Sequence, residues 1–254
     1  MTTAVFLAFL VVLVVSAVFS MFGKGGGSIY TPVLVMLGWE LTTSISTALF
    51  LNLVTALVAT VVFARNRLVD FKSSSVFLPG TIAGSILGAL LSSRAPKDVL
   101  LGLFSVFLLG AGILMIRSSE GEADQQAKRL SGRLAAVVVL FSFAVGVLSS
   151  LIGVGGGLVI FPFLVLYLKY HAQRAAGANA YIVTVSSLVG SLGHLSVGHV
   201  DYPLIGITAI AAAIGSSIGS HVTVKASPKF VKVAFAIIMW VFSGQIALHL
   251  LKVI

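Results

Sequence analysis

Two glycine-rich stretches carry the residue types that could bind an anion. They occupy residues 23–32 and 153–162, both read G-x-G-G-G-x4-P, and begin 130 residues apart. Glycine triplets weaken helices, and a helix that restarts after such a break has free N–H groups and a positive dipole end at its first turn. We therefore predict an anion site between two helix starts. Its backbone ligands would be Gly25, Gly26, Gly27, Gly155, Gly156 and Gly157.

The alternative interpretation is that these glycines only allow close helix packing. Lys24 bears on the choice, because it occupies the variable position of the first motif where the second has Val154. A lysine there could neutralise an anion or control its entry. It could also be a topology anchor whose ammonium reaches the membrane surface.

Further candidates to line the path are small amide and hydroxyl side chains inside apolar segments, which can replace water around an anionic oxygen. They are Asn52, Asn179, Thr184 and Ser187. The structural alternative is that each bonds a neighbouring helix. His194 titrates near neutral pH in its ordinary state and is the candidate for proton coupling.

The distribution of acidic residues argues against an enzyme. All seven Asp and Glu residues fall in predicted loops or at segment ends, and the chain has no cysteine. Paired carboxylates, clustered metal ligands and a Ser-His-Asp arrangement are missing from the sequence pattern. We expect neither a cofactor nor a metal.

Composition places the chain in the membrane. It is 58% hydrophobic and 9% charged, against roughly 25% charged residues in ordinary soluble domains. The net charge of +9 comes from Lys and Arg that separate apolar segments, with no basic patch interleaved with aromatics, so nucleic-acid binding is not expected.

Ten apolar segments are predicted. They lie near residues 3–22, 26–38, 41–64, 75–93, 97–116, 134–152, 156–169, 172–196, 202–222 and 228–251. The second and seventh, which start at the glycine motifs, are too short to span a ~30 Å hydrocarbon core. Those two motifs must therefore lie at some depth in the membrane.

The two halves of the chain resemble each other beyond the glycine motifs. At an offset of 131 residues, Gly84 and Gly88 fall on Gly215 and Gly219, where small residues let helices approach closely. This predicts an all-α polytopic protein with a first repeat at 1–116, a cytoplasmic linker at 117–133 and a second repeat at 134–254. Asp70 also falls on Asp201, and we expect both to cap the following helix.

Charge bias predicts the topology. With ten crossings, thirteen Lys and Arg lie on one side and three on the other, which by the positive-inside rule puts both termini in the periplasm. Five crossings per half is an odd number, so the repeats are expected to be inverted. Inverted repeats with interrupted helices indicate a secondary transporter with a site near the midplane.

The paired motifs, the element Gly177-Ala178-Asn179 and the turn Gly198-His199-Val200-Asp201 resemble the TauE/SafE sulfite exporter family, also called TSUP. The resemblance covers nearly the whole chain. It implies a carrier of the bacterial inner membrane for sulfite, thiosulfate, a sulfonate or sulfoacetate, working by alternating access. Direction, coupling to protons or sodium, and a homodimeric state are left open.

Three other functions are compatible with these patterns. An anion channel would use the same helix dipoles, and a carrier of small organic carboxylates would need the same site. A membrane scaffold would use the glycines for packing alone.

Overall fold

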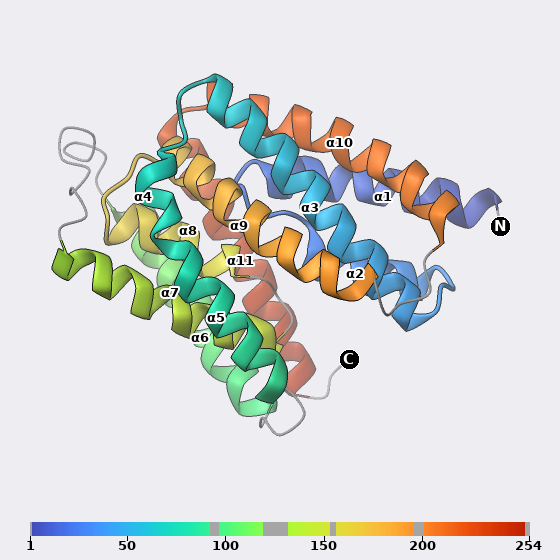
Figure 1. The fold of residues 1–254 in the computed structure, drawn as a ribbon, viewed down its shortest axis with the longest axis horizontal. Coiled ribbons are helices and arrows are strands. Elements are labelled where there is room, and N and C mark those ends of the chain that lie inside the picture. The colour runs from blue at the N-terminus through green and yellow to red at the C-terminus, as the bar shows by residue number, and fades with distance from the viewer. Residues whose placement is uncertain (1, 92–96, 119–131, 153–155, 196–200, 252–254) are drawn as a thin grey trace.

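The computed structural model describes residues 2–91, 97–118, 132–152, 156–195 and 201–251. Within these ranges the chain is helical and forms one bundle (Figure 1). The helices are α1 (Thr2–Ser20), α2 (Gly27–Met36), α3 (Leu41–Arg65), α4 (Phe71–Ser75), α5 (Phe77–Leu91), α6 (Lys97–Arg117), α7 (Gly132–Ile152), α8 (Gly157–Leu166), α9 (Ala172–Leu195), α10 (Tyr202–Lys225) and α11 (Pro228–Leu250).

The ten predicted segments are confirmed, with one refinement. The segment expected at 75–93 is preceded by the short helix α4, and the Asp70 carboxylate caps it by accepting the Ser73 N–H at 3.2 Å. Asp201 caps α10 in the same way, accepting the Leu204 N–H at 3.0 Å. The predicted capping roles are therefore correct. Most of the predicted linker at 117–133 lies outside the described residues.

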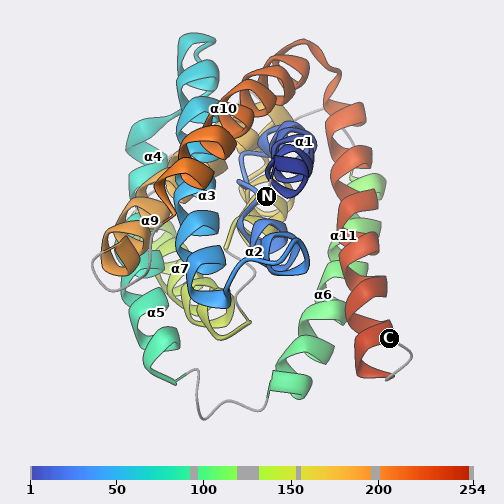
Figure 2. The ribbon, with the colours of Figure 1, turned by 90° about the vertical axis from the view of Figure 1, so that its right-hand side faces the viewer.

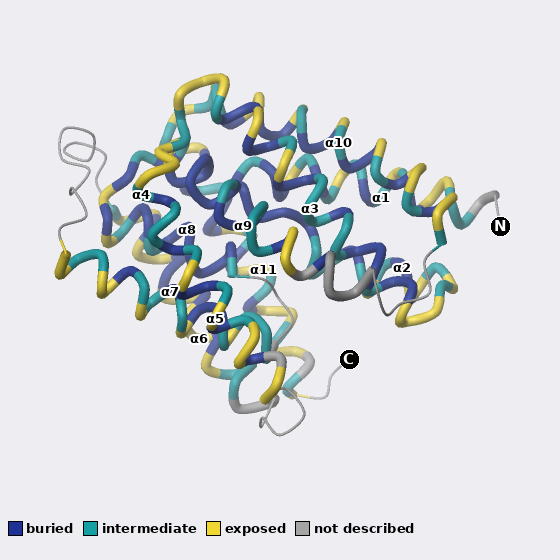
Figure 3. The backbone as a smooth tube through the Cα atoms, in the orientation of Figure 1, coloured by how far each residue is buried: buried dark blue, intermediate teal, exposed yellow. Residues whose placement is uncertain are grey.

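Helix lengths fit a polytopic membrane protein. In the described residues five helices are long and apolar enough to cross a bilayer, and shorter apolar helices include 4–20, α2 and α8. At 1.5 Å per residue, α2 and α8 with ten residues each reach only about 15 Å. Residues of α8 and α9 make up much of the buried interior of the bundle (Figure 3).

Helix α10 packs closely along α1 through its small residues (Figure 1). A Cβ added at Gly215 would collide with the Leu13 carbonyl, and one added at Gly219 would collide with the Ala17 carbonyl. Because the residue numbers rise together along the contact, the two helices run parallel. The predicted packing role of these glycines is confirmed.

Helix α5 packs on α7 in the equivalent way. A Cβ at Gly84 would collide with the Phe143 carbonyl, and one at Gly88 would approach the Val147 carbonyl to 2.5 Å. Phe143 and Val147 lie 130 residues after the two residues that α10 contacts on α1. The same kind of helix pair therefore occurs twice. In one pair α10 of the second half packs on α1 of the first, and in the other α5 of the first half packs on α7 of the second.

Equivalent helices of the two halves run in opposite directions. The third helices, α3 and α9, pair so that Thr60 Oγ1 lies 2.9 Å from Thr184 Oγ1 while Ser191 Oγ donates to the Leu49 carbonyl at 3.2 Å. Residue numbers rise along one helix as they fall along the other. This is the antiparallel relation that inverted repeats require.

The last helices of each half, α6 and α11, confirm this relation (Figure 2). Ser105 Oγ and Ser243 Oγ are 2.7 Å apart along the contact between the two helices. Near the end of α6 and the start of α11, the Lys232 ammonium donates to the Ser118 carbonyl at 2.9 Å. The two helices are antiparallel. The fold is thus two inverted five-segment repeats with short second helices, α2 and α8, of which α8 is almost wholly buried and α2 buries Tyr30 and Leu34.

Candidate functional site

The first break ends α1 with a glycine-dependent turn. The Lys24 N–H donates to the Phe19 carbonyl at 3.2 Å and the Gly23 N–H to the Ser20 carbonyl at 3.0 Å. This is a Schellman motif with a left-handed residue after the cap, and Gly23 has φ +64°. A side chain there would also collide with α9 at the Ala176 carbonyl, so glycine is required.

The helices that follow the two breaks begin in the same way. In α2 the N–H groups of Ile29 and Tyr30 both donate to the Gly26 carbonyl, at 2.9 and 3.2 Å. In α8 those of Val159 and Ile160 both donate to the Gly156 carbonyl, at 3.0 Å each. Each short helix therefore begins at the last glycine of its motif.

A proline that follows a helix break is expected in the first turn of the new helix, where its missing N–H costs little, but the prolines of these two motifs lie further along. Pro32 and Pro162 are inside α2 and α8, each at the sixth residue. The reason is that Gly27 and Gly157 are themselves helical, which moves each helix start five residues ahead of the proline.

An asparagine from a long helix contacts the start of each short helix. Asn52 Oδ1 accepts the Gly27 N–H at 2.9 Å, and Asn52 Nδ2 donates to Ser187 Oγ at 2.7 Å. Asn179 Nδ2 donates to the Gly157 carbonyl at 3.2 Å and to the Phe22 carbonyl at 2.8 Å. Gly27 and Gly157 are equivalent positions, so each break has an amide side chain of its own.

The two amides differ in how they are satisfied. Asn52 is half-buried, and its oxygen already accepts the N–H of the first residue of α2. Asn179 is fully buried, and its Oδ1 atom has no hydrogen-bond partner among the residues that the structure describes. A buried acceptor without a partner is uncommon. Because an amide oxygen only accepts hydrogen bonds, this atom suits a hydrogen-bond donor or a cation and not an anionic oxygen.

The two breaks meet in the interior of the protein. A Cβ added to Gly157 would lie 3.0 Å from Lys24 Cγ and 3.2 Å from a methyl of Val183. Asn52, at the first break, is the twelfth of 25 residues in α3, which places it about 17 Å from the start of that helix. The site is therefore deep within the bundle, at mid-helix.

Lys24 lies at this meeting point and is 4% exposed. Its ammonium donates to Ser28 Oγ at 2.8 Å and lies over two phenyl rings, 4.4 Å from the Phe19 centroid and 4.7 Å from the Phe242 centroid. In the described part of the chain no carboxylate pairs with it. The geometry does not support a lysine that reaches the membrane surface, since it places the ammonium in the protein interior.

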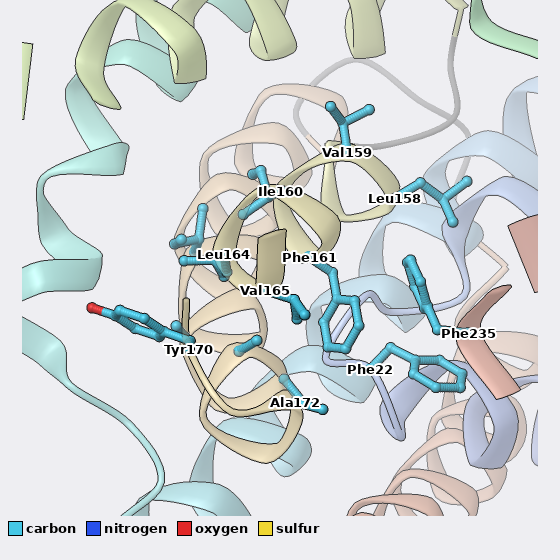
Figure 4. Close-up of a cluster of buried hydrophobic side chains, with 14 of the residues drawn as sticks. Phe22, Leu158, Val159, Ile160, Phe161, Leu164, Val165, Tyr170, Ala172 and Phe235 are labelled. Carbon is cyan, nitrogen blue, oxygen red and sulfur yellow. The ribbon is translucent and has the colours of Figure 1, made fainter. Parts of the chain in front are cut away.

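Apolar packing surrounds the site on the α8 side. The rings of Phe22, Phe161 and Phe235 pack together with centroids 4.3 to 5.9 Å apart (Figure 4). They come from the turn after α1, from α8 and from α11. This cluster excludes water and lowers the local dielectric, which strengthens electrostatic interactions at the breaks.

The other predicted site residues are placed as follows. Ser187 contacts Asn52, whereas Thr184, about one turn earlier on α9, pairs with Thr60 and bonds none of the motif glycines that the structure describes. Gly155 lies outside the described residues, and so does the side chain of His194, which is in the last turn of α9. Whether these residues bind substrate stays a prediction.

Sequence reasoning missed the partners of Lys24. Ser28 carries a weak signal, because it lies four residues after the lysine at helical spacing. Phe242 carries none, because it is more than two hundred residues away and looks like any apolar residue of a membrane segment. In the described residues no group of three or more acidic or histidine side chains could hold a metal ion.

We expect Asn179→Ala to destabilise the protein by about 2 kcal/mol, because it leaves two buried carbonyls without their donor. The melting temperature in detergent should fall by roughly 5 °C. The matched control is Asn66→Ala, whose exposed side chain bonds only the Val62 carbonyl and should change the melting temperature by less than about 2 °C. Equal effects of the two substitutions would contradict the role given to Asn179.

Comparison with known proteins decides the family. The family model described as "Sulfite exporter TauE/SafE" matches residues 8–246, nearly the whole chain. The chain belongs to the sulfite exporter TauE/SafE family. The protein is therefore a membrane transporter and not an enzyme, and the resemblance noted from the glycine motifs is confirmed.

Relatives within the TauE/SafE family are distant but matched along most of their length. Probable membrane transporter protein YunE of Bacillus subtilis is 25% identical over 92% of this chain and 94% of the relative. Probable membrane transporter protein MJ0441 of Methanocaldococcus jannaschii is 26% identical over 87% of each. Probable membrane transporter protein YfcA of Escherichia coli is 22% identical over 87% of this chain and 82% of the relative. No solved structure matches the chain.

Proposed function

We propose that this TauE/SafE protein is a secondary transporter that moves a small sulfur-containing anion across the bacterial inner membrane by alternating access. The candidate substrates are sulfite, thiosulfate, a sulfonate or sulfoacetate. One observation carries the proposal: the ammonium of Lys24 is buried where the two breaks meet, with no carboxylate partner in the described residues. A buried charge is costly unless an opposite charge compensates it.

The surrounding groups support an anion as the compensating charge. Gly157 begins α8 in contact with Lys24, and the positive dipole end of a helix favours anions at its N-terminus. Ser28 and Asn52 add a hydroxyl and an amide that can bond anionic oxygens. In the proposed cycle, movement of the helices around the two breaks exposes this site to each side of the membrane in turn.

Reconstitution into liposomes tests the proposal. Purified protein should accumulate or release one of sulfite, thiosulfate, sulfoacetate or taurine faster than empty liposomes do, with saturation and counterflow exchange. Transport of short carboxylates alone would show a different substrate class. Flux without saturation or counterflow would indicate an anion channel, and no flux with any anion would contradict the proposal.

Coupling and orientation need separate measurements. Imposed proton and sodium gradients across the liposome membrane would show which ion, if either, drives accumulation. Cysteines introduced near each terminus, in a chain that has none, should react with impermeant thiol reagents from the periplasmic side. Labelling from the cytoplasmic side would contradict the proposed topology.

A further inference from the structure

The ammonium of Lys24 is held by two aromatic rings instead of an acid. Its nitrogen lies 4.4 Å from the Phe19 ring centroid and 4.7 Å from that of Phe242, distances at which the ring face attracts a cation. The two rings are 5.9 Å apart and nearly perpendicular, at 83°. The hydroxyl of Ser28 supplies the remaining polar contact at 2.8 Å.

The three contacts come from different parts of the chain. Phe19 is in the last turn of α1 and Ser28 in the first turn of α2, so both belong to the same break as Lys24. Phe242 is on α11, the last helix of the second repeat. Of these contacts, the one made by Phe242 is therefore the one that movement of α11 relative to α1 can break.

A ring face is suited to a site that must later bind an anion. It stabilises the ammonium without carrying a net charge, so it does not neutralise the lysine as a carboxylate would. An anion that reaches the Lys24 nitrogen must nevertheless replace one of the contacts that surround it. The contact with Phe242 is weaker than a charge-assisted hydrogen bond and is the easiest to replace.

We propose that Phe242, together with Phe19, is a positioning residue that holds the Lys24 ammonium at the breaks and is displaced when the anion binds. The inference rests on the proposed anion site. Binding of the anion then separates Phe242 from Phe19 and moves α11 relative to α1, and return of the ring to Lys24 helps to expel the anion. Phe242 would thereby link occupancy of the site to movement of α11 relative to α1.

Removing the ring at position 242 is expected to tighten anion binding and to slow turnover. Phe242→Leu keeps an apolar side chain but removes the competitor for the ammonium, so sulfoacetate or sulfite should bind about fivefold more tightly. Turnover in liposomes should fall, because release becomes slower. Phe242→Tyr keeps the ring and should bind within about twofold of the unchanged protein. Phe230→Leu, on an exposed face of the same helix, is the matched control and should leave binding unchanged.

A double-mutant cycle separates the ring contact from general packing. Melting temperatures of the full chain in detergent without added anion are compared for Phe242→Leu, Lys24→Met and the double variant. Phe242→Leu should destabilise the protein more when Lys24 is present than when it is methionine. If the leucine variant does not fold, trifluorophenylalanine at position 242 keeps the shape of the ring and weakens its negative face. It should likewise destabilise the protein more when Lys24 is present than when residue 24 is methionine.

Each outcome decides the proposal. Coupled stability effects together with tighter anion binding support it. Additive stability effects, or anion binding that is unchanged or weaker in Phe242→Leu, overturn it. If no anion stabilises the unchanged protein while the stability coupling persists, the proposed function fails and the role of Phe242 in anion release fails with it, although the contact with Lys24 stands.

Discussion

Replacing Lys24 with methionine is expected to lower kcat/KM for the transported anion by about 10²-fold, which corresponds to about 2.7 kcal/mol of charge-assisted contact. Methionine has a similar shape, so the packing against Gly157 and the two phenyl rings should survive while the charge is lost. Initial rates of uptake into liposomes over a range of anion concentrations measure the effect.

Two controls make the Lys24 experiment decisive. Lys72→Met removes an exposed lysine on α4 and should leave transport within about twofold, since exposed charges contribute little. Lys24→Arg keeps the charge but changes its geometry, so it should retain more activity than Lys24→Met. Unchanged transport by Lys24→Met would show that the anion does not depend on this ammonium, and the proposed site would have to be abandoned.

Adding one methyl group at Gly219 is expected to destabilise the protein by about 3 kcal/mol or more, because the new Cβ would collide with the backbone of α1 at Ala17. The melting temperature in detergent should fall by roughly 10 °C. A backbone carbonyl cannot rotate away as a flexible side chain could, so α10 and α1 would have to separate.

A control for Gly219 is present on the same helix. Gly206 in α10 has nothing within 4 Å of its Cβ position, so Gly206→Ala should gain helix propensity and raise the melting temperature by about 2 °C. Gly84→Ala in α5 should cause a similar loss, because its new Cβ would collide with the Phe143 carbonyl of α7 in the equivalent helix pair. Similar melting temperatures for Gly219→Ala and Gly206→Ala would contradict the close packing of α10 on α1.

The two halves share a backbone plan but differ in chemistry at the breaks. In the first half Tyr30 is buried and its hydroxyl lies 3.0 Å from Thr55 Oγ1, whereas the equivalent position on α8 is Ile160. Ser28, which bonds Lys24, is matched by Leu158. The charged group of the site and its hydroxyl partner therefore come from the first repeat, and the second contributes its helix start, Asn179, Ser187 and an apolar wall.

Much of the fold could be predicted from local patterns. Apolar runs bounded by charges give helix positions to within a few residues, because both burial in lipid and helix geometry act on short stretches of chain. The places of the prolines within the short helices could not be predicted in the same way, because a glycine inside the first helical turn is indistinguishable by sequence from one in the preceding loop. Which glycine begins the helix depends on contacts such as that of Asn52 with Gly27.

The sequence by itself determined that this is a membrane protein of two repeats with a glycine break in each, and it identified Lys24 and Asn179 as the residues to examine. Only the tertiary structure decided that the breaks touch each other, that Asn52 and Asn179 each bond the start of a short helix, and that Phe242 completes the surroundings of Lys24. The physical reason is separation along the chain. Helix formation follows from neighbouring residues, whereas a contact between α1 and α11 exists only after the two inverted repeats have packed together.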